Sequence, residues 1–358
     1  MFPRNSGRVH ARVDSVRKDR VRIARLHDGR TGRLRQPDTM TASPILATFR
    51  ALVSGALKLL LLTALNMVCA AGAARVFMPQ FNFAGAEAAA GWALGALGDA
   101  LLFSGLLMFL ILRSRLRGAR LVVWLVVLLF FVRIAQPQIE TLVFEAARAR
   151  LPPGVFIALW PMGLAHLALF VPLAVIVLRR WRGAPEPPAF ELEMSPGEWG
   201  AKLLSGAVLY VPVYFLFGYY IAWQVPEIRA FYGGPAELNG FWASVRDVFE
   251  KTPWLPFLQL ERGLFWALLA IPLVRMTRGS AREAALSVSL TFAIALSSQL
   301  LIPGPHMPEA VRMGHFVEIL VSGLLYGWLV ARILLVKRLP ANAGLSAVWR
   351  RRPPSRSH

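Results

Sequence analysis

The chain alternates between long apolar stretches and shorter polar connections. A helix needs about 20 mostly apolar residues to cross the hydrocarbon core of a bilayer, and eight stretches reach that length. We therefore predict an all-α polytopic membrane protein with eight spanning helices. They are expected over residues 51–75, 91–112, 120–144, 155–178, 200–223, 257–275, 283–302 and 312–336.

Basic residues gather in every second connection. The first connection, residues 77–90, contains no Lys or Arg, whereas the second contains Arg113, Arg115, Arg117 and Arg120. Cytoplasmic loops carry an excess of Lys and Arg. We therefore predict that the second connection and both termini lie in the cytoplasm.

Composition supports the membrane assignment. Hydrophobic residues make up 56% of the chain and the mean hydropathy is +0.51, which is too apolar for an ordinary soluble domain. The net charge of +20 comes from clusters between apolar stretches, so we expect anionic lipids at the cytoplasmic face as partners and no nucleic acid. A bacterial cytoplasmic (inner) membrane is the expected location. Cys69 is the single cysteine, which excludes an intramolecular disulfide.

The N-terminal region has two possible interpretations. Residues 1–45 are rich in Arg and lack apolar periodicity, so they are predicted to be a disordered basic tail, with Met40 as an alternative start. The segment after Met40 also resembles a signal peptide, with Lys58 in its basic flank and small residues at 70–74. We favour an uncleaved helix because the apolar pattern continues through Phe77.

A Pro-rich cytoplasmic linker over residues 181–199 divides the chain into a first membrane half, 46–180, and a second, 200–337, followed by a basic cytoplasmic tail, 338–358. Parts of the two halves can be aligned, so that Asp99 matches Glu261 and Arg113 matches Arg275. Two halves with an even number of helices would be parallel repeats, as in some transporters. Chance similarity between Leu-rich helices is the alternative.

Ionisable groups inside the spans mark the candidate chemistry. Each costs about 2.5–3.5 kcal/mol at the centre of a membrane helix on insertion scales, so each needs a partner or a wet cavity. They are Asp99, Arg133, Glu140, His166, Glu261, Arg262, His315 and Glu318. In the predicted topology most lie in the outer third, with the amides Gln136, Gln138 and Gln299. We expect an outward-facing polar pocket formed by the second, third, sixth, seventh and eighth helices.

Arg312, His315 and Glu318 recur every three residues at the start of the last helix, so they share a face. His315 could act as a base that Glu318 orients. The pair could also bind a metal if His166 or Glu261 completed the site. An interhelical network is the structural alternative, and the metal stays unassigned.

Arg262 is the strongest candidate for binding an anionic group, because a guanidinium holds carboxylate or phosphate through two parallel hydrogen bonds. A bundle could set Arg262 against Glu318 or Asp99. Glu261, its neighbour in sequence, could then meet His315 or Arg312. A structural ion pair is the alternative for Arg262.

Two further features concern the shape of the membrane region. Pro137 is expected to kink the third helix next to Arg133 and Glu140. The longest outer loop, residues 225–256, contains a segment over 241–249 whose pattern favours an amphipathic helix that rests on the outer leaflet or covers the pocket.

No known catalytic or nucleotide-binding motif occurs, so neither a reaction nor a cofactor is assigned. The leading hypothesis is a transporter or permease for a small anionic solute. Arg262 and Arg312 would contact the anion, Asp99, Glu261 and Glu318 would be proton or cation partners, and Gln299 would line the pocket.

Two other classes remain open. A membrane-embedded enzyme could act on a lipid or lipid-linked substrate at the outer leaflet, with His315 as base and Glu318 orienting it. A structural or sensory membrane component would use its polar groups only to hold helices together.

Overall fold

The computed structural model describes residues 44–78, 86–143, 154–190, 192–304 and 307–336. The chain divides into two compact units at Ser54. Of the first unit the structure describes residues 44–54, which are the first turns of helix α2 (Pro44–Phe77), and positions 46–54 are exposed. All that follows concerns the second unit, residues 55–358.

The predicted helices are all present. The spans correspond to α2, α3 (Ala86–Arg113), α4–η1–α5 (Gly118–Phe130, Phe131–Ala135, Gln136–Val143), α7 (Val155–Val177), α8 (Pro196–Tyr220), α11 (Leu255–Met276), α12–η3 (Ala281–Ser297, Ser298–Leu301) and α13 (Glu309–Leu335). Eight helices in the described ranges are long and apolar enough to cross a membrane. The all-α multipass fold is thus confirmed, while the side on which each terminus lies stays a prediction.

The loop between α8 and α11 contains short helices. They are η2 (Ala222–Gln224), α9 (Pro226–Phe231) and α10 (Phe241–Lys251). The helix predicted over 241–249 is therefore confirmed, and none of its residues is buried. Trp242 and Phe249 on α10 are 77% and 53% exposed. Their position relative to a leaflet stays a prediction.

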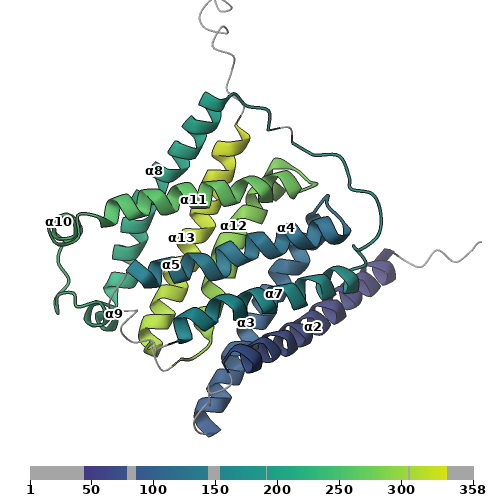
Figure 1. Cartoon of the computed structure of the whole chain (residues 1–358), viewed down its shortest axis with the longest axis horizontal. Coiled ribbons are helices and arrows are strands. Elements are labelled where there is room, and N and C mark those ends of the chain that lie inside the picture. Colours follow the sequence, from purple (N-terminus) through teal and green to yellow (C-terminus); the bar gives the residue numbers. More distant parts are fainter. Residues whose placement is uncertain (1–43, 79–85, 144–153, 191, 305–306, 337–358) are drawn as a thin grey trace, which may run out of the picture. The chain divides into compact units, whose positions relative to one another are not determined.

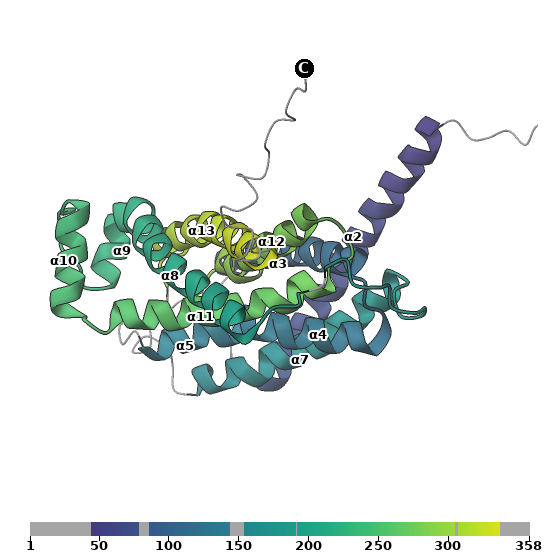
Figure 2. The ribbon, with the colours of Figure 1, turned by 90° about the horizontal axis from the view of Figure 1, so that it is seen from above.

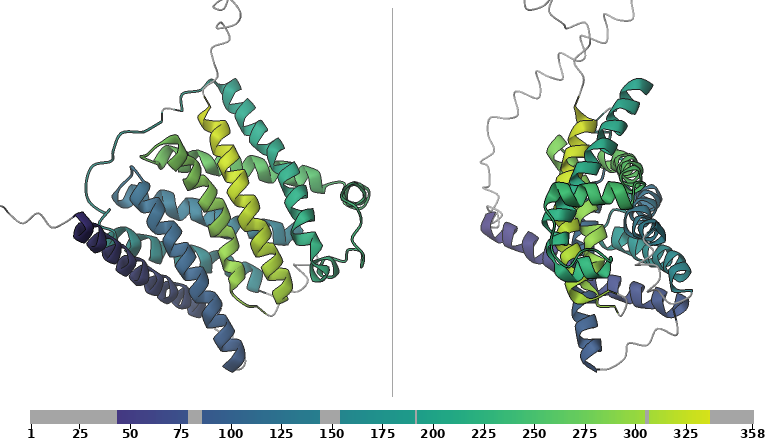
Figure 3. Two further views of the ribbon diagram at one scale, coloured as in Figure 1. Left: turned by 180° about the vertical axis from the view of Figure 1, so that it is seen from behind. Right: turned by 90° about the vertical axis from the view of Figure 1, so that its left-hand side faces the viewer.

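The long helices after α2 lie in two layers. One layer contains α3, α12, α13 and α8, which lie side by side in the left view of Figure 3. The other contains α7, α4–α5 and α11, and its helices cross those of the first layer in Figure 1. Figure 2 shows α12 and α13 on one side and α4–α5 and α7 on the other. Phe103, Phe170 and Leu273 are fully buried in the core.

The backbones of α12 and α13 approach each other closely. A Cβ atom built at Gly323 would lie 2.9 Å from the Ala293 Cα atom, and one built at Gly327 would lie 2.6 Å from the Ser289 Cα atom. Ser289 donates a hydrogen bond across this contact to the Leu324 carbonyl at 2.6 Å. Small residues that let backbones approach in this way are typical of membrane helix packing.

The third predicted helix contains a π-helical segment, Phe131–Ala135, directly before Pro137. Pro137 has no N–H to donate to the carbonyl of Arg133, four residues earlier. The Gln299 side chain of η3 donates to that carbonyl instead, at 3.1 Å. The break expected at Pro137 thus takes the form of a π-helical turn whose free carbonyl is satisfied by another helix.

Two connections at the opposite end of these helices pair with each other. Ser114, between α3 and α4, forms an antiparallel bridge with Thr277, between α11 and α12. The Arg115 N–H donates to the Met276 carbonyl at 2.8 Å, and the Arg278 N–H donates to the Arg113 carbonyl at 2.9 Å. The two hydrogen bonds are reciprocal, as is usual in an antiparallel pairing.

Glu186 of the α7–α8 linker ties these two connections together. Its carboxylate accepts hydrogen bonds from Arg117 at 3.1 Å and Arg278 at 3.3 Å. Arg180 lies 4.0 Å from the same oxygen. Partial burial raises the pKa of Glu186, but the positive charge of Arg278, the hydrogen bonds and the charge of Arg180 lower it by more, so its pKa lies below the ordinary value.

We expect Glu186→Gln to destabilise the protein at neutral pH and to have no effect in acid. A carboxyl group whose pKa is lowered by folding contributes stability above its unfolded pKa, and this is lost as pH falls from 4.5 through the lower folded value. The thermal midpoints of wild type and variant should therefore converge below pH 4.5. Glu193→Gln, on the same linker without a described partner, is the control. A difference that persists unchanged in acid would contradict the prediction.

Candidate functional site

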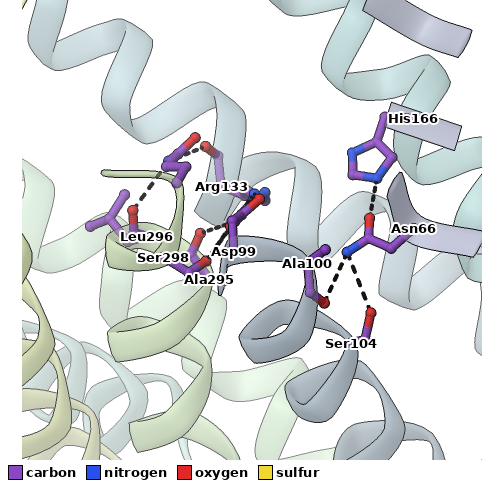
Figure 4. A network of polar contacts seen from close by, with 10 residues as sticks. Asn66, Asp99, Ala100, Ser104, Arg133, His166, Ala295, Leu296 and Ser298 are labelled. Carbon is purple, nitrogen blue, oxygen red and sulfur yellow. Dashed lines mark hydrogen bonds and ion pairs between the residues drawn. The ribbon is translucent and has the colours of Figure 1, made fainter. Parts of the chain in front are cut away.

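A buried ion pair joins α3 to η1. The Arg133 Nη2 atom donates to both carboxylate oxygens of Asp99, at 2.7 and 2.6 Å (Figure 4). The two residues are 5% and 7% exposed. Ser298 of η3 also donates to Asp99, at 2.7 Å. The carboxylate therefore has three hydrogen-bond contacts inside the helix bundle.

The Arg133 guanidinium has further contacts with α12 and η3. Its Nη1 atom donates to the Ala295 carbonyl and to the Ser298 hydroxyl, each at 3.0 Å. The guanidinium carbon lies 4.4 Å from the centre of the Phe103 ring. We call Asp99, Arg133, Ser298 and Gln299 the Asp99 network. Since most of its donors and acceptors are matched within the protein, this network suits a structural role.

A separate contact holds His166 of α7 (Figure 4). Its Nε2 atom lies 2.6 Å from the Asn66 side-chain oxygen. The Asn66 amide donates to the Ala100 carbonyl at 3.3 Å and to Ser104 at 3.4 Å. The asparagine oxygen accepts, so His166 donates from Nε2. This series of hydrogen bonds connects α7, α2 and α3, so His166 is bonded within the helix bundle.

A second ion pair, which is bidentate, joins α11 to α5. The Arg262 Nη1 and Nη2 atoms donate to the two Glu140 oxygens, at 3.1 and 3.0 Å. Arg262 also donates to Gln259 Oε1 at 3.0 Å, and its guanidinium carbon lies 5.7 Å from the centre of the Tyr210 ring. The side chain of Arg262 is 6% exposed and that of Glu140 is 36% exposed. The pair is therefore accessible from the Glu140 side.

His315 and Glu318 pair on α13. The His315 Nδ1 atom lies 2.7 Å from a Glu318 oxygen. An ionised carboxylate only accepts, so Nδ1 carries the hydrogen and Nε2 of a neutral ring is left as an acceptor. Nε2 is buried and has no hydrogen-bond partner among the described residues. This is the geometry of a histidine base oriented by a carboxylate.

The Arg262 and His315 pairs belong to one cluster. The charges of Glu140, Arg262 and Glu318 all act on the Tyr214 hydroxyl of α8, and Glu140 also acts on His315. We call the following residues the Arg262 cluster: Glu140, Tyr210, Tyr214, Gln259, Arg262, His315 and Glu318. Arg262 Nε and Gln259 Nε2 are buried donors with no hydrogen-bond partner in the described part of the chain, so the cluster has donors to spare.

The expected partners of Arg262 and Glu261 are wrong. Arg262 pairs with Glu140, because Asp99 is already held by Arg133 and Glu318 by His315. Glu261 is exposed and has no ion pair with a described residue. Neighbouring residues on a helix point about 100° apart. Since Arg262 faces the bundle, Glu261 faces away from it and cannot reach His315 or Arg312.

The remaining predicted residues lie outside the Arg262 cluster. Arg312 donates to the Leu300 carbonyl at 2.6 Å and so anchors α13 to η3. Gln299 donates to the carbonyls of Arg133 and Leu296, and Asp99 is held in its own network. Of the predicted substrate-binding residues, only Arg262 lies with His315 and Glu318.

The described ranges contain no third ligand for a metal bound at His315 and Glu318. They contain no group of three or more His, Cys, Asp or Glu residues placed to hold a metal. His166 is bonded to Asn66, and Glu261 is exposed. Neither therefore completes a site with His315 and Glu318.

Sequence reasoning did not select several residues of these contacts. Asn66 could have been noticed as an amide in an apolar stretch, on the same cost argument as the ionisable groups. Gln259 lies within the sixth span and was overlooked beside Glu261. Tyr210 and Tyr214 gave no signal, because interfacial aromatic residues are common near the ends of membrane helices.

Comparisons with protein-family models, curated proteins and solved structures gave no match. A functional assignment therefore rests on the geometry described above.

Proposed function

We propose that the chain transports a small anionic solute and that the Arg262 cluster binds it. The observation that carries the proposal is the Arg262–Glu140 pair. Glu140 occupies two donors of a buried guanidinium just as a carboxylate solute would, at 3.0 and 3.1 Å. Glu140 is more exposed than Arg262, so an anion arriving from that side can replace it.

The position of the pair suits alternating access. Glu140 belongs to the first predicted half and Arg262 to the second, and transporters with repeated halves bind their substrate between the halves. In this proposal, exchange of Glu140 for solute loosens or tightens the contact between the halves.

Protons would couple to the solute through Glu140. Protonation neutralises its carboxylate, so Arg262 loses its counter-charge and can accept the anion. Release of the solute leaves Arg262 unpaired, and Glu140 then gives up its proton and pairs again. One proton moves with one negative charge of solute. His315 and Glu318, which bond each other at 2.7 Å in the same cluster, would carry the proton to and from it.

The proposal includes an orientation. We place the protein in the cytoplasmic membrane of a bacterium, with both termini inside and the Arg262 cluster toward the outside. The basic connections gather at the end opposite the cluster, where Glu186 bonds Arg117 and Arg278. The excess of Arg at that end supports a cytoplasmic face next to anionic lipids.

Uptake into proteoliposomes tests the transport proposal. Lactate, succinate, inorganic phosphate and sulfate are offered with and without an inward proton gradient. We expect gradient-driven flux of at least one anion in wild type, and none in Glu140→Gln/Arg262→Gln, which keeps a neutral hydrogen-bonded pair in place of the ion pair. Glu140→Gln alone should retain flux but lose its dependence on the gradient. The matched control is Glu261→Gln, because Glu261 is the sequence neighbour of Arg262 but faces away from the helix bundle.

Two results would overturn the proposal. One is the absence of flux in wild type for all four anions, with no anion-dependent rise of the melting temperature. The other is flux that the double variant retains.

The His315–Glu318 pair supports an enzyme as the second candidate. A histidine held at Nδ1 by a carboxylate, with Nε2 left to accept a proton, is arranged as a general base. Its substrate would be a lipid or lipid-linked molecule at the outer leaflet. Turnover of radiolabelled bacterial lipid extract that is lost in His315→Gln, in the absence of anion flux, would favour this candidate over transport.

A further inference from the structure

The C-terminal end of α7 has an unusual backbone. The Arg179 N–H donates to the Ile176 carbonyl at 2.9 Å and the Arg180 N–H to the Val175 carbonyl at 2.9 Å. These are the two bonds of a Schellman motif, in which the residue after the C-cap adopts the left-handed conformation. Here that residue is Arg179, with φ of 57°.

Arginine is an unfavourable choice at this position. A left-handed backbone brings the Cβ atom of an L-residue close to the following carbonyl oxygen, and glycine avoids this contact. The other described residues with positive φ are all glycines: Gly118, Gly154, Gly183 and Gly233. Strain that a simple substitution would relieve points to a use for the side chain.

The neighbouring arginines have different environments. Arg180 is 8% exposed and donates to the carbonyls of Ile111, Leu112 and Ser114, so it fastens α7 to the α3–α4 connection. Arg179 and Arg182 are exposed, and neither has a hydrogen bond or ion pair with a described residue. A buried structural arginine, Arg180, thus lies in sequence between two available guanidinium groups.

The two available arginines line a surface pocket. The pocket has a volume of about 350 Å³ and is lined by Ile176, Arg179, Trp181 and Arg182. Ile176 and Trp181 are 53% and 44% exposed. The pocket begins at Ile176 in the last turn of α7, which ends at Val177, so its apolar wall lies in the span and its cationic wall just beyond it. Trp and Arg at this depth are typical contacts of lipid headgroups.

We propose that this pocket binds the phosphate of an anionic phospholipid. Arg179 and Arg182 would hold the phosphate, Trp181 would lie at the level of the headgroup, and Ile176 would contact the start of an acyl chain. Guanidinium groups bind phosphate oxygens through charge-assisted hydrogen bonds. The left-handed conformation of Arg179 is retained because it directs this side chain to the lipid while Arg180 faces the protein.

Native mass spectrometry of the full chain tests the proposal. The detergent-purified protein is titrated with phosphatidylglycerol or phosphatidylcholine. We expect selective retention of phosphatidylglycerol, and binding weaker by about fivefold for each arginine removed in Arg179→Gly and Arg182→Gln. Arg120→Gln removes another exposed arginine without a described partner and should bind like wild type.

A melting curve in lipid-free detergent shows whether each variant is folded. Arg179→Gly suits the left-handed backbone, so its melting temperature should equal or exceed that of wild type while its lipid binding falls. Equal retention of both lipids, or full phosphatidylglycerol binding by Arg179→Gly, would overturn the proposal. Displacement of phosphatidylglycerol by millimolar inorganic phosphate would also overturn it, because the ligand would then be the free ion.

Discussion

Replacing Asp99 with asparagine is expected to destabilise the membrane domain by about 3–5 kcal/mol, the usual cost of removing one partner of a buried ion pair. Asp99 is 7% exposed, and both of its carboxylate oxygens accept hydrogen bonds from the Arg133 Nη2 atom. The variant would leave the Arg133 charge inside the bundle without its counter-ion. Equilibrium unfolding in mixed detergent micelles measures the change.

A double-mutant cycle shows whether the pair is the cause. Asp99→Asn combined with Arg133→Met removes both charges, so we expect it to cost less than the sum of the two single changes. Glu261→Gln is the control, because Glu261 is the residue that the predicted repeat aligns with Asp99 and yet it is exposed. A loss in Glu261→Gln as large as in Asp99→Asn would contradict the prediction.

Adding a methyl group at Gly327 is expected to cost about 1–3 kcal/mol, the usual range for overpacking. The new Cβ atom would lie 2.6 Å from the Ser289 Cα atom and 3.0 Å from the Val288 carbonyl oxygen. Both neighbours are backbone atoms of α12, so side-chain rotation cannot relieve the contact. The helices would have to separate, which would also weaken the Ser289–Leu324 hydrogen bond.

The matched control for Gly327→Ala is Gly72→Ala in α2. A Cβ atom at Gly72 meets no atom within 4 Å, so this change should not lower stability and should raise it slightly, because alanine favours the helix over glycine. Thermal unfolding of the two variants in the same detergent gives the comparison. The packing argument fails if both variants melt at the wild-type temperature.

Sequence alone could predict the spans because membrane crossing depends on local length and apolarity. Residues 155–178 were expected to form the fourth span, and the helix extends from Val155 to Val177. The same reasoning located the ionisable groups, since their cost in lipid depends on position along the helix. The length of a span and the position of a charge along it can both be determined without knowing the neighbouring helices.

The partners of those groups could not be predicted in the same way. Which carboxylate meets Arg262 depends on the rotation and tilt of α5 and α11, and the two residues are 122 positions apart in sequence. The acceptor left free by Pro137 was foreseeable, but its donor Gln299 lies 166 positions from Arg133. A pattern within one helix contains no information about such distant contacts.

The contacts of Glu186 have a consequence for the order of assembly during synthesis. Glu186 follows the fourth span, and one of its partners, Arg278, follows the sixth. During chain elongation, Arg117 and Arg180 are made before Glu186, so this carboxylate cannot compensate their charge until the α7–α8 linker emerges. Their uncompensated charge is thus greatest while the early helices are being inserted, when a charge bias fixes orientation. Arg278 then joins the cluster after the sixth span, while α12 and α13 are still to be made.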